Sequence, residues 1–257
     1  MNKSNLFEKN GYSIVNVFNR NEINGIGSII EQRLNRIIRK KIFKKNINKL
    51  HKVIKSEDIY KKIIRSPTRY IDIGNNKIKK VNSNKEIKKI LNNFWSHAQT
   101  KIIWVGDPKK RELKKNKIGF RIARPAKKND AASEHVDMYN NDMKSFVSLW
   151  IPIIGFNKKQ TLRLYPSTYK IRHKLNSYIK NKKVISRVLK KSYSNKFRST
   201  RFALKPGQGI LFHPNTIHGS SDNLGKGTRV SIEFRIFNKR RFNLNKSFSL
   251  NQNLSLY

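Results

Sequence analysis

The sequence contains no cysteine, and its 58 Lys and Arg residues greatly outnumber its 15 Asp and Glu residues. The absence of cysteine excludes a disulfide framework, a thiolate metal site and a cysteine nucleophile. It also suits a reducing compartment, so we expect a cytoplasmic protein.

Long apolar runs are missing as well. The longest, residues 146–156, is too short to span a bilayer, and the first five residues lead into no apolar core of signal-peptide length. We therefore expect a soluble, unprocessed protein with no membrane span.

The shortage of acidic residues gives a formal net charge of +43. Such a charge is typical of nucleic-acid-binding proteins and predicts nonspecific polyanion binding at low salt. The lysines are nevertheless interleaved with Asn and Ile along the whole chain, which favours a solvated basic surface over a shaped nucleic-acid interface. A basic rim that attracts an anionic substrate is an intermediate hypothesis, and no pattern indicates an oligomeric state.

Length and patterning predict one domain over residues 1–257, with a helix-rich N-terminal part (about 1–100), a strand-rich core (about 101–240) and a polar C-terminal tail (about 241–257). Composition predicts partial disorder over residues 243–257. The fold class is mainly β with flanking α-helices and a double-stranded β-helix (jelly-roll, cupin-like) core that closes two sheets around a pocket. An opening strand is predicted at 12–17, and core strands at 102–105, 118–122, 146–153, 161–165, 210–213 and 229–237.

Helix signals are concentrated before residue 100. Asn21 is the predicted N-cap of the first helix, Ser56 caps a shorter second helix, and Ser83 to Glu86 match a capping box. Residues 169–193 are predicted to form a helical or irregular insertion over the pocket.

The most informative motif is His135-Val136-Asp137, followed some eighty residues later by His218. Two imidazoles and one carboxylate can occupy one face of a non-haem Fe(II), which leaves positions for an organic acid and O2. A lone His-x-Asp is common, but here a turn-like stretch precedes it and a buried strand follows it. His213 is the alternative ligand, although Pro214 follows it and its spacing to Arg229 is longer.

Arg229 lies eleven residues after His218 and begins a strictly alternating segment. As a strand, this segment places Arg229, Ser231, Glu233 and Arg235 on one face. A hairpin would set Arg229 beside the His218 strand, where its guanidinium could clamp the distal carboxylate of an iron-bound diacid. Arg235 is the alternative clamp. Whether Arg121 and Arg124 face the cavity or the solvent stays open.

The same residues carry a resemblance to the phytanoyl-CoA dioxygenase-like family of Fe(II)- and 2-oxoglutarate-dependent oxygenases. Besides His135, Asp137 and His218, the resemblance rests on four segments in the same order as in that family: residues 7–23, 147–153, 162–167 and 206–220. Ser167-Thr168-Tyr169 departs from the family's Gly-Ser-His, and Lys159-Gln160 from its Asn-Gly. The acyl-CoA specificity of the founding member is therefore not carried over.

The resemblance implies iron ligation by His135, Asp137 and His218. It further implies that Arg229 binds the far carboxylate of 2-oxoglutarate, with Trp150 and Ser220 as further cosubstrate contacts. The implied enzyme uses Fe(2+), 2-oxoglutarate and O2, with ascorbate as a stimulating reductant. It hydroxylates a small or carrier-linked metabolite and releases succinate and CO2, because Asp137 fills the position that halogenating relatives leave to a small residue.

Two other hypotheses remain open. In the first, the chain is a basic nucleic-acid-binding protein, or a nucleic-acid-modifying oxygenase, on the same barrel. In the second, it is a cupin-like metal protein that does not use 2-oxoglutarate, and Arg229 argues against this one.

Overall fold

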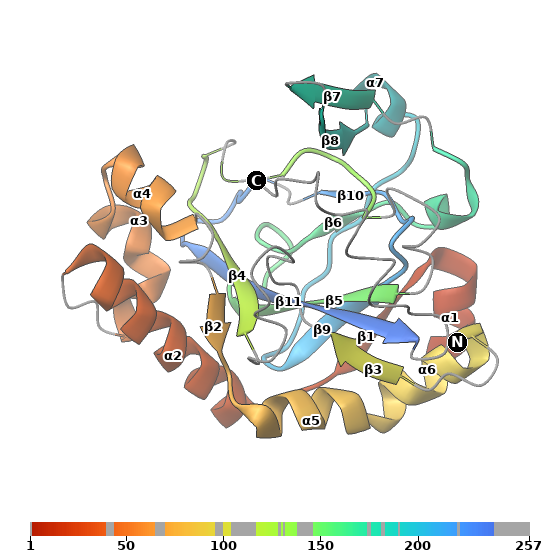
Figure 1. The fold of residues 1–257 in the computed structure, drawn as a ribbon, viewed down its shortest axis with the longest axis horizontal. Helices are drawn as coiled ribbons and strands as arrows, with labels where there is room; N and C mark the ends of the chain where they lie inside the picture. Colours follow the sequence, from red (N-terminus) through yellow and green to blue (C-terminus); the bar gives the residue numbers. More distant parts are fainter. Residues whose placement is uncertain are drawn as a thin grey trace.

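The computed structural model describes residues 2–39, 44–64, 70–95, 100–103, 117–127, 130, 132–137, 146–173, 176–180, 183–189, 191–219 and 222–238 (Figure 1). The predicted polar tail, 243–257, lies outside these residues. Most helices precede the strand-rich core: α1 (Lys3–Asn10), α2 (Arg20–Ile38), a 3-10 helix (Lys44–Lys49), α3 (Leu50–Val53), α4 (Glu57–Ile64), α5 (Asn75–Ser83) and α6 (Lys85–Trp95). Among the described helices, none is long and apolar enough to cross a membrane.

Within the described residues, seven strands form the main antiparallel sheet, in the order β1-β9-β5-β11-β4-β2, with β3 also paired to β11. Their bounds are β1 Tyr12–Asn16, β2 Tyr70–Asp72, β3 Thr100–Ile103, β4 Lys117–Ala123, β5 Phe146–Ile154, β9 Gln208–Phe212 and β11 Arg229–Asn238. A smaller sheet pairs β6 (Arg163–Leu164) with β10 (His218–Gly219). The predicted jelly-roll core with flanking helices is thereby confirmed.

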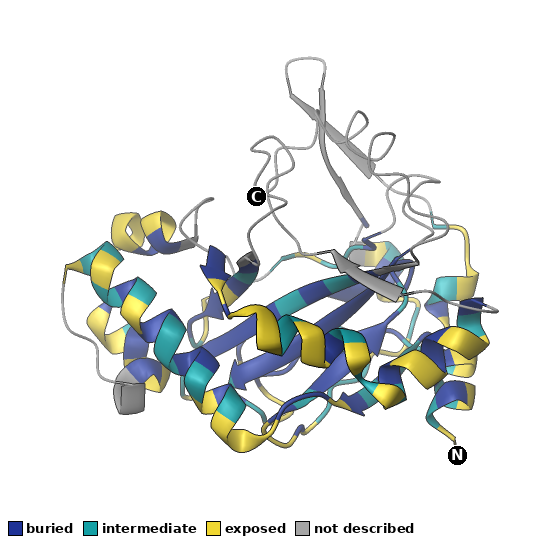
Figure 2. Ribbon diagram, turned by 60° about the horizontal axis from the view of Figure 1, so that its bottom comes forward, coloured by how far each residue is buried: buried dark blue, intermediate teal, exposed yellow. Residues whose placement is uncertain are grey.

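The two faces of the main sheet have different surroundings. Val230, Ile232 and Phe234 of β11 join the large apolar core, to which α2 contributes Ile26 and Ile30. The helices expose their polar sides and turn their buried sides toward the strands (Figure 2). The opposite face, which carries Trp150, looks toward the small sheet. The alternation predicted for residues 229–235 is confirmed.

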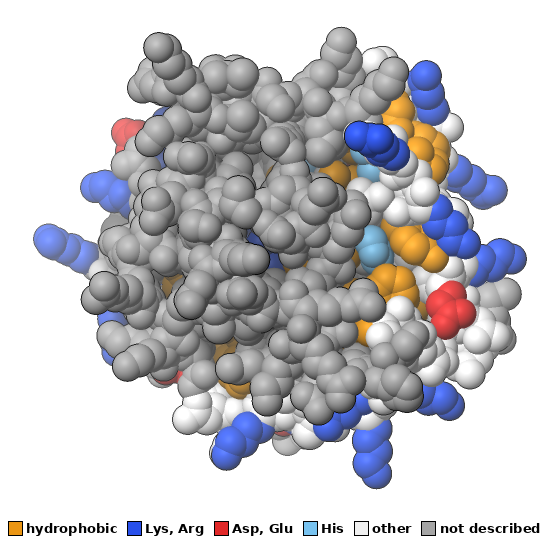
Figure 3. All heavy atoms as spheres, turned by 45° about the vertical axis from the view of Figure 1, so that its right-hand side comes forward, with side chains coloured by type: hydrophobic (Ala, Val, Ile, Leu, Met, Phe, Trp, Pro, Cys, Tyr) orange, Lys and Arg blue, Asp and Glu red, His pale blue; other side chains and the backbone are white. Residues whose placement is uncertain are grey.

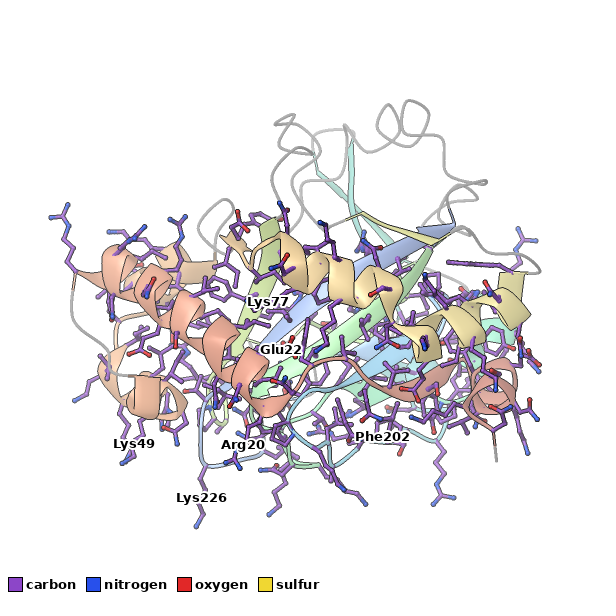
Figure 4. All side chains as sticks on the ribbon, turned by 90° about the horizontal axis from the view of Figure 1, so that it is seen from below. Arg20, Glu22, Lys49, Lys77, Phe202 and Lys226 are labelled. Atoms are coloured by element: carbon purple, nitrogen blue, oxygen red, sulfur yellow. The ribbon has the colours of Figure 1, made fainter. Side chains whose placement is uncertain are left out.

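Helix α2 begins two residues earlier than predicted. Asn19, not Asn21, is its N-cap, and Asn19 and Glu22 form a reciprocal capping box. Glu22 also binds Lys80 of α5, which ties the two helices together, and Arg20 at the start of α2 points away from the sheet (Figure 4). The N-cap was misplaced because both Asn19 and Asn21 are good caps, and only the chain direction after β1 selects between them.

The structure also tests the predicted N-caps of α6 and α4. At α6 the cap is Asn84, whose side chain accepts from the Ile87 amide, and not the predicted Ser83. Glu86 does not close a box, since it binds Lys3 and the Asn16 amide of β1 instead. The Ser56 cap fits better, because α4 begins at the next residue.

Two predictions about the second half of the chain are wrong. Within the predicted helical or irregular insertion, β7 (Asn176–Lys180) and β8 (Lys183–Val188) are instead paired antiparallel strands, whereas α7 (Lys191–Ser194) fits the prediction. Arg229 is also not in a hairpin with the His218 strand. β10 pairs with β6, whereas β11 pairs with β3, β4 and β5, so residues 222–228 carry the chain from one sheet to the other.

One glycine is required where β9 enters the main sheet. Gly207 has φ +90°, and a Cβ there would lie 1.8 Å from the Phe18 carbonyl oxygen. Its own carbonyl accepts from the Val17 and Phe18 amides. Only glycine permits this approach, which sets the register between β1 and β9.

Arg124, one of the two arginines left open above, is structural. Its guanidinium makes a two-point contact with Asp130, at 2.8 Å from Nε and 2.7 Å from Nη2, and lies over the Tyr60 ring. Nη2 also donates to Glu57 of α4 at 3.0 Å. The group therefore joins the end of β4 to α4.

We expect Asp130→Ala to lower the free energy of unfolding by about 3–5 kcal/mol, because it leaves the buried Arg124 charge without its bidentate partner. The Asp130 side chain is only 1 % exposed, whereas that of Glu57 is 52 % exposed. Glu57→Ala is thus the matched control and should cost much less in urea unfolding. Equal losses in the two variants would contradict a buried role for Asp130.

Candidate metal centre

Three ligand-type side chains meet between the two sheets. His135 and Asp137 come from the segment between β4 and β5, and His218 begins β10. The backbone brings them together, because His135 and His218 exchange two hydrogen bonds, at 2.8 and 2.9 Å, and the Asp137 amide donates to Pro214 at 2.7 Å. Val136 points the other way and packs against Tyr165, Leu189 and Ile217. This alternation explains the His-x-Asp spacing.

The donor atoms of His135, Asp137 and His218 all lie within 4.8 Å of one another. Asp137 Oδ1 is 3.8 Å from Nε2 of each histidine. Two ligands bound to one ion at about 2.1 Å can be at most roughly 4 Å apart, so a single ion can bridge these pairs. Among the described residues, this is the group of His, Asp and Glu side chains with metal-ligand spacing.

Hydrogen bonds fix the orientation of both imidazoles. His135 Nδ1 lies 2.7 Å from the Ser133 carbonyl and His218 Nδ1 lies 3.0 Å from the Thr216 carbonyl. A carbonyl only accepts, so Nδ1 carries the proton and Nε2 presents its lone pair to the centre. Burial, and then the neighbouring His218, lowers the pKa of His135 to about 3, which keeps this imidazole neutral at pH 7.

The carboxylate is held by two strands of the main sheet. Ser148 of β5 donates to Asp137 Oδ2 at 2.7 Å, which leaves Oδ1 directed at the histidines. Arg235 of β11 places Nη2 3.7 Å from Oδ1. Although burial opposes its charge, the His218 and Arg235 side chains hold the pKa of Asp137 below its usual range. Asp137 is thus an ionised candidate ligand in a fixed orientation.

Arg229 lies at the far end of the same face of β11. It is 1 % exposed, and its Nη1 donates to the Gln160 carbonyl at 3.1 Å. Burial, and after it the charge of Arg121, lowers the pKa of Arg229 to about 10, so the surroundings favour an incoming anion. The neighbouring Ser231 hydroxyl is buried and has no hydrogen-bond partner among the described residues. A carboxylate would satisfy such a donor.

Between Arg229 and Arg235 the face carries an ion pair. Glu233 of β11 lies 3.6 Å from Arg121 of β4, which is cross-strand to Ser231. Because Arg121 pairs across the strands with Ser231, it lies on the same face of the sheet as Arg229, and its side chain is 43 % exposed. Arg121 therefore shares the face of the candidate site and also reaches solvent.

The other predicted site residues lie in different surroundings. Trp150 is on the cavity face, packed with Leu162, Leu164 and Phe212, and its contact with a cosubstrate stays a prediction. Ser220 lies outside the described residues. The alternative ligand His213 is elsewhere, because its Nδ1 accepts from the Asn215 amide and its ring packs against Phe94 and Tyr169.

Sequence reasoning missed Ser148 and Ser231 as parts of the site. Both were within its reach, since each alternates with a predicted site residue on its own strand, Ser148 with Trp150 and Ser231 with Arg229. The donors present fit the expected groups: two imidazoles and a carboxylate suit Fe(II), and a buried arginine beside an unsatisfied hydroxyl suits a carboxylate.

Comparison with known proteins supports the same chemistry. The sequence profile of the family described as Phytanoyl-CoA dioxygenase (PhyH) matches residues 7–231. A search among curated proteins gives no significant match.

Several solved structures share the fold. The α-ketoglutarate-dependent carbocyclase SnoK from nogalamycin biosynthesis has a TM-score of 0.56 at 11% identity, over 92% of this chain and 83% of its own. EctD from S. alaskensis, with 2-oxoglutarate and 5-hydroxyectoine, has 0.55 at 12% identity, over 93% and 76%. AviO1 from Streptomyces viridochromogenes has 0.53 at 11% identity, over 92% and 94%.

At sequence identities this low, the solved structures show a shared fold only. The match to the family profile covers most of the chain and includes the three residues that converge between the sheets. The chain belongs to the phytanoyl-CoA dioxygenase family and is a 2-oxoglutarate-dependent non-haem iron dioxygenase.

Proposed function

We propose that this dioxygenase hydroxylates a small or carrier-linked metabolite, with Fe(II) held by His135, Asp137 and His218. The observation that carries the proposal is the convergence of two Nδ1-anchored imidazoles on one oxygen of a carboxylate. When bound, Fe(II), 2-oxoglutarate and O2 supply the oxidant for a C–H bond, and 2-oxoglutarate is split to succinate and CO2.

The chain's own residues bind, orient and shield these reactants. Asp137 keeps the third protein position of the metal, which favours hydroxylation over halogenation. Arg229 and Ser231 bind the distal carboxylate of 2-oxoglutarate and fix its direction. Trp150, Leu164 and Phe212 line the inner core with apolar surface, which limits access of water. Desaturation and ring formation remain competing outcomes, because similar folds include a carbocyclase and an epimerase.

The segment Ser167-Thr168-Tyr169, which departs from the family's Gly-Ser-His, is held by contacts with backbone carbonyls. Ser167 has φ +64° and its hydroxyl donates to the Lys9 carbonyl, so this turn is fastened to α1. Thr168 is buried and donates to the Tyr165 carbonyl, while Tyr169 contacts the Glu8 carbonyl. The residues that replace the family's Gly-Ser-His thus have a structural role, and the acyl-CoA specificity is not carried over to this chain.

Replacing His135, Asp137 or His218 by Ala should abolish stoichiometric Fe(II) binding and 2-oxoglutarate turnover in a folded protein, because each removes a ligand. Anaerobic iron titration and succinate release measure the two effects. His213→Ala is the matched control and should retain Fe(II). Full iron binding and activity in His218→Ala would contradict the assignment of His218 as a ligand and favour His213.

Arg229→Gln should weaken 2-oxoglutarate about ten- to a hundredfold, since it removes a charge-assisted contact worth roughly 1.5–3 kcal/mol. Fe(II) binding should stay intact. Pyruvate provides the internal control, because it has the chelating end of 2-oxoglutarate but no distal carboxylate, and its affinity should not change. Arg229→Lys should recover part of the loss. The measurement is cosubstrate affinity in iron-loaded, oxygen-free protein. An unchanged 2-oxoglutarate affinity would refute the binding of the distal carboxylate by Arg229.

A second candidate function, nucleic-acid binding, is motivated by the +43 net charge. On the described surface of the face in Figure 3, Lys and Arg side chains project separately and do not gather into one patch. This dispersal supports nonspecific polyanion binding by a surface that has no part in catalysis.

Binding of generic duplex DNA should therefore fall steeply with salt, because each phosphate contact releases counterions, and should be equal in wild type and Asp137→Ala. Fluorescence anisotropy at several salt concentrations measures it. Sequence-selective binding that survives moderate salt would instead indicate a nucleic-acid substrate.

A further inference from the structure

Gln160 stands at a position where this chain departs from the glycine of its family, and it is buried, with 6 % of the residue exposed. A buried side-chain amide needs hydrogen-bond partners. Both ends of this amide have one: Nε2 donates to the Gly227 carbonyl at 2.9 Å, and Oε1 accepts from Asn157 at 2.7 Å. Gln160 therefore ties the turn after β5 to the segment that leads into β11.

Glycines on both segments leave room for the Gln160 side chain. A Cβ at Gly225 would lie 2.6 Å from Gln160 Cγ, and a Cβ at Gly155 would lie 3.2 Å from Gln160 Cδ. The second one would also lie 3.3 Å from the Arg229 Cα. Because the amide is held at both ends, it cannot move aside for a side chain at these places. The Gln160 amide is thus packed next to the first residue of β11.

The main-chain carbonyl of Gln160 contacts the guanidinium of Arg229, whose Nη1 donates to it at 3.1 Å. The main chain of Arg229 is placed by other contacts, because it pairs with Ala123 of β4 and the preceding Thr228 amide donates to Asn48 at 2.7 Å. A fixed Cα does not fix the end of an arginine, since several rotatable bonds separate the two. The Gln160 carbonyl therefore helps to set the direction of the guanidinium.

We propose that Gln160 is a positioning residue for Arg229 and thereby sets the length of the 2-oxo diacid that this enzyme binds. The proposal rests on the proposed function, in which Arg229 binds the distal carboxylate, and deepens it. The metal fixes the chelating end of such an acid, so the place of the guanidinium selects the number of carbons between the two ends. A guanidinium that is held in one direction favours one chain length.

Gln160→Leu tests the proposal, because it keeps a side chain of similar size and removes both amide hydrogen bonds. The surrounding segments retain other contacts. The Gly227 carbonyl also accepts from Asn223 at 2.7 Å, and the Lys159 carbonyl accepts from the Leu224 amide at 2.9 Å. We therefore expect a folded variant in which the Gln160 carbonyl is less firmly placed. Gln160→Gly, which has the family's residue, removes the same contacts and is the second variant.

Gln208→Leu is the matched control. The Gln208 amide also joins two segments, since Nε2 donates to Asn16 at 3.1 Å and Oε1 accepts from the Lys205 amide at 2.9 Å. Neither of these hydrogen bonds reaches β11. A loss that comes only from breaking a bridging glutamine should therefore occur in both variants.

Calorimetry in iron-loaded, oxygen-free protein measures the affinities for 2-oxoglutarate, for pyruvate and for 2-oxoadipate, which has one more methylene than 2-oxoglutarate. Gln160→Leu should weaken 2-oxoglutarate about two- to tenfold, as expected for the loss of one or two hydrogen bonds. It should also reduce the preference for 2-oxoglutarate over 2-oxoadipate. Pyruvate and Fe(II) should bind as in wild type, because neither contacts Arg229. Gln208→Leu should leave all four affinities unchanged.

A double variant shows whether Gln160 acts through Arg229. Once Arg229→Gln has removed the guanidinium, Gln160→Leu should have no further effect on 2-oxoglutarate affinity. Additive losses would mean that the glutamine acts independently, and they would overturn the proposal. Wild-type affinity for 2-oxoglutarate in Gln160→Leu, or an equal loss for pyruvate, would overturn it too.

These results differ from a failure of the proposed function. In that failure the wild-type protein would not bind Fe(II), or Arg229→Gln alone would leave 2-oxoglutarate affinity unchanged.

Discussion

Strand β11 has an apolar face in the core and a charged face on the other side, and the rest of the structure depends on its register. Its even-numbered residues lie in the apolar core shared with the helices, while Arg229, Ser231, Glu233 and Arg235 face the cavity. Because side chains alternate strictly along a strand, a shift of one residue would bury these charges under α2 and expose the apolar set. Pairing with both β4 and β5 fixes the register against such a shift.

The same strand register places the side chains around Asp137. Arg235 lies opposite Ser148, and both approach Asp137 from neighbouring strands, one at each carboxylate oxygen. The small sheet supplies His218, and the backbone exchange with His135 joins that sheet to the segment before β5. Each candidate ligand is therefore placed by main-chain hydrogen bonds and oriented by a neighbouring polar group, as in a preorganised metal site.

The scarcity of acidic residues has a structural counterpart. Several of the acids that the structure describes hold specific elements together: Glu22 joins α2 to α5, Glu86 joins α6 to α1 and β1, and Asp130 holds Arg124. The large basic excess is dispersed on the surface, so it governs association with polyanions and solubility more than the fold.

Periodicity and residue chemistry in the sequence alone determined the jelly-roll class, the cavity-facing alternation of residues 229–235 and the three residues that the structure brings together, although their role as iron ligands stays a prediction. The alternation is local, because it is written in consecutive residues, whereas the link of His135 and Asp137 to His218 was inferred from the chemistry of the residue types and the family resemblance. Tertiary structure decided the rest. The choice of Asn19 over Asn21 depends on the path from β1, and the hairpin at 176–188 and the separation of His218 from β11 depend on which strands pair. Strand pairing joins residues far apart in the chain, so no local pattern shows that Ser148 and Arg235 both reach Asp137.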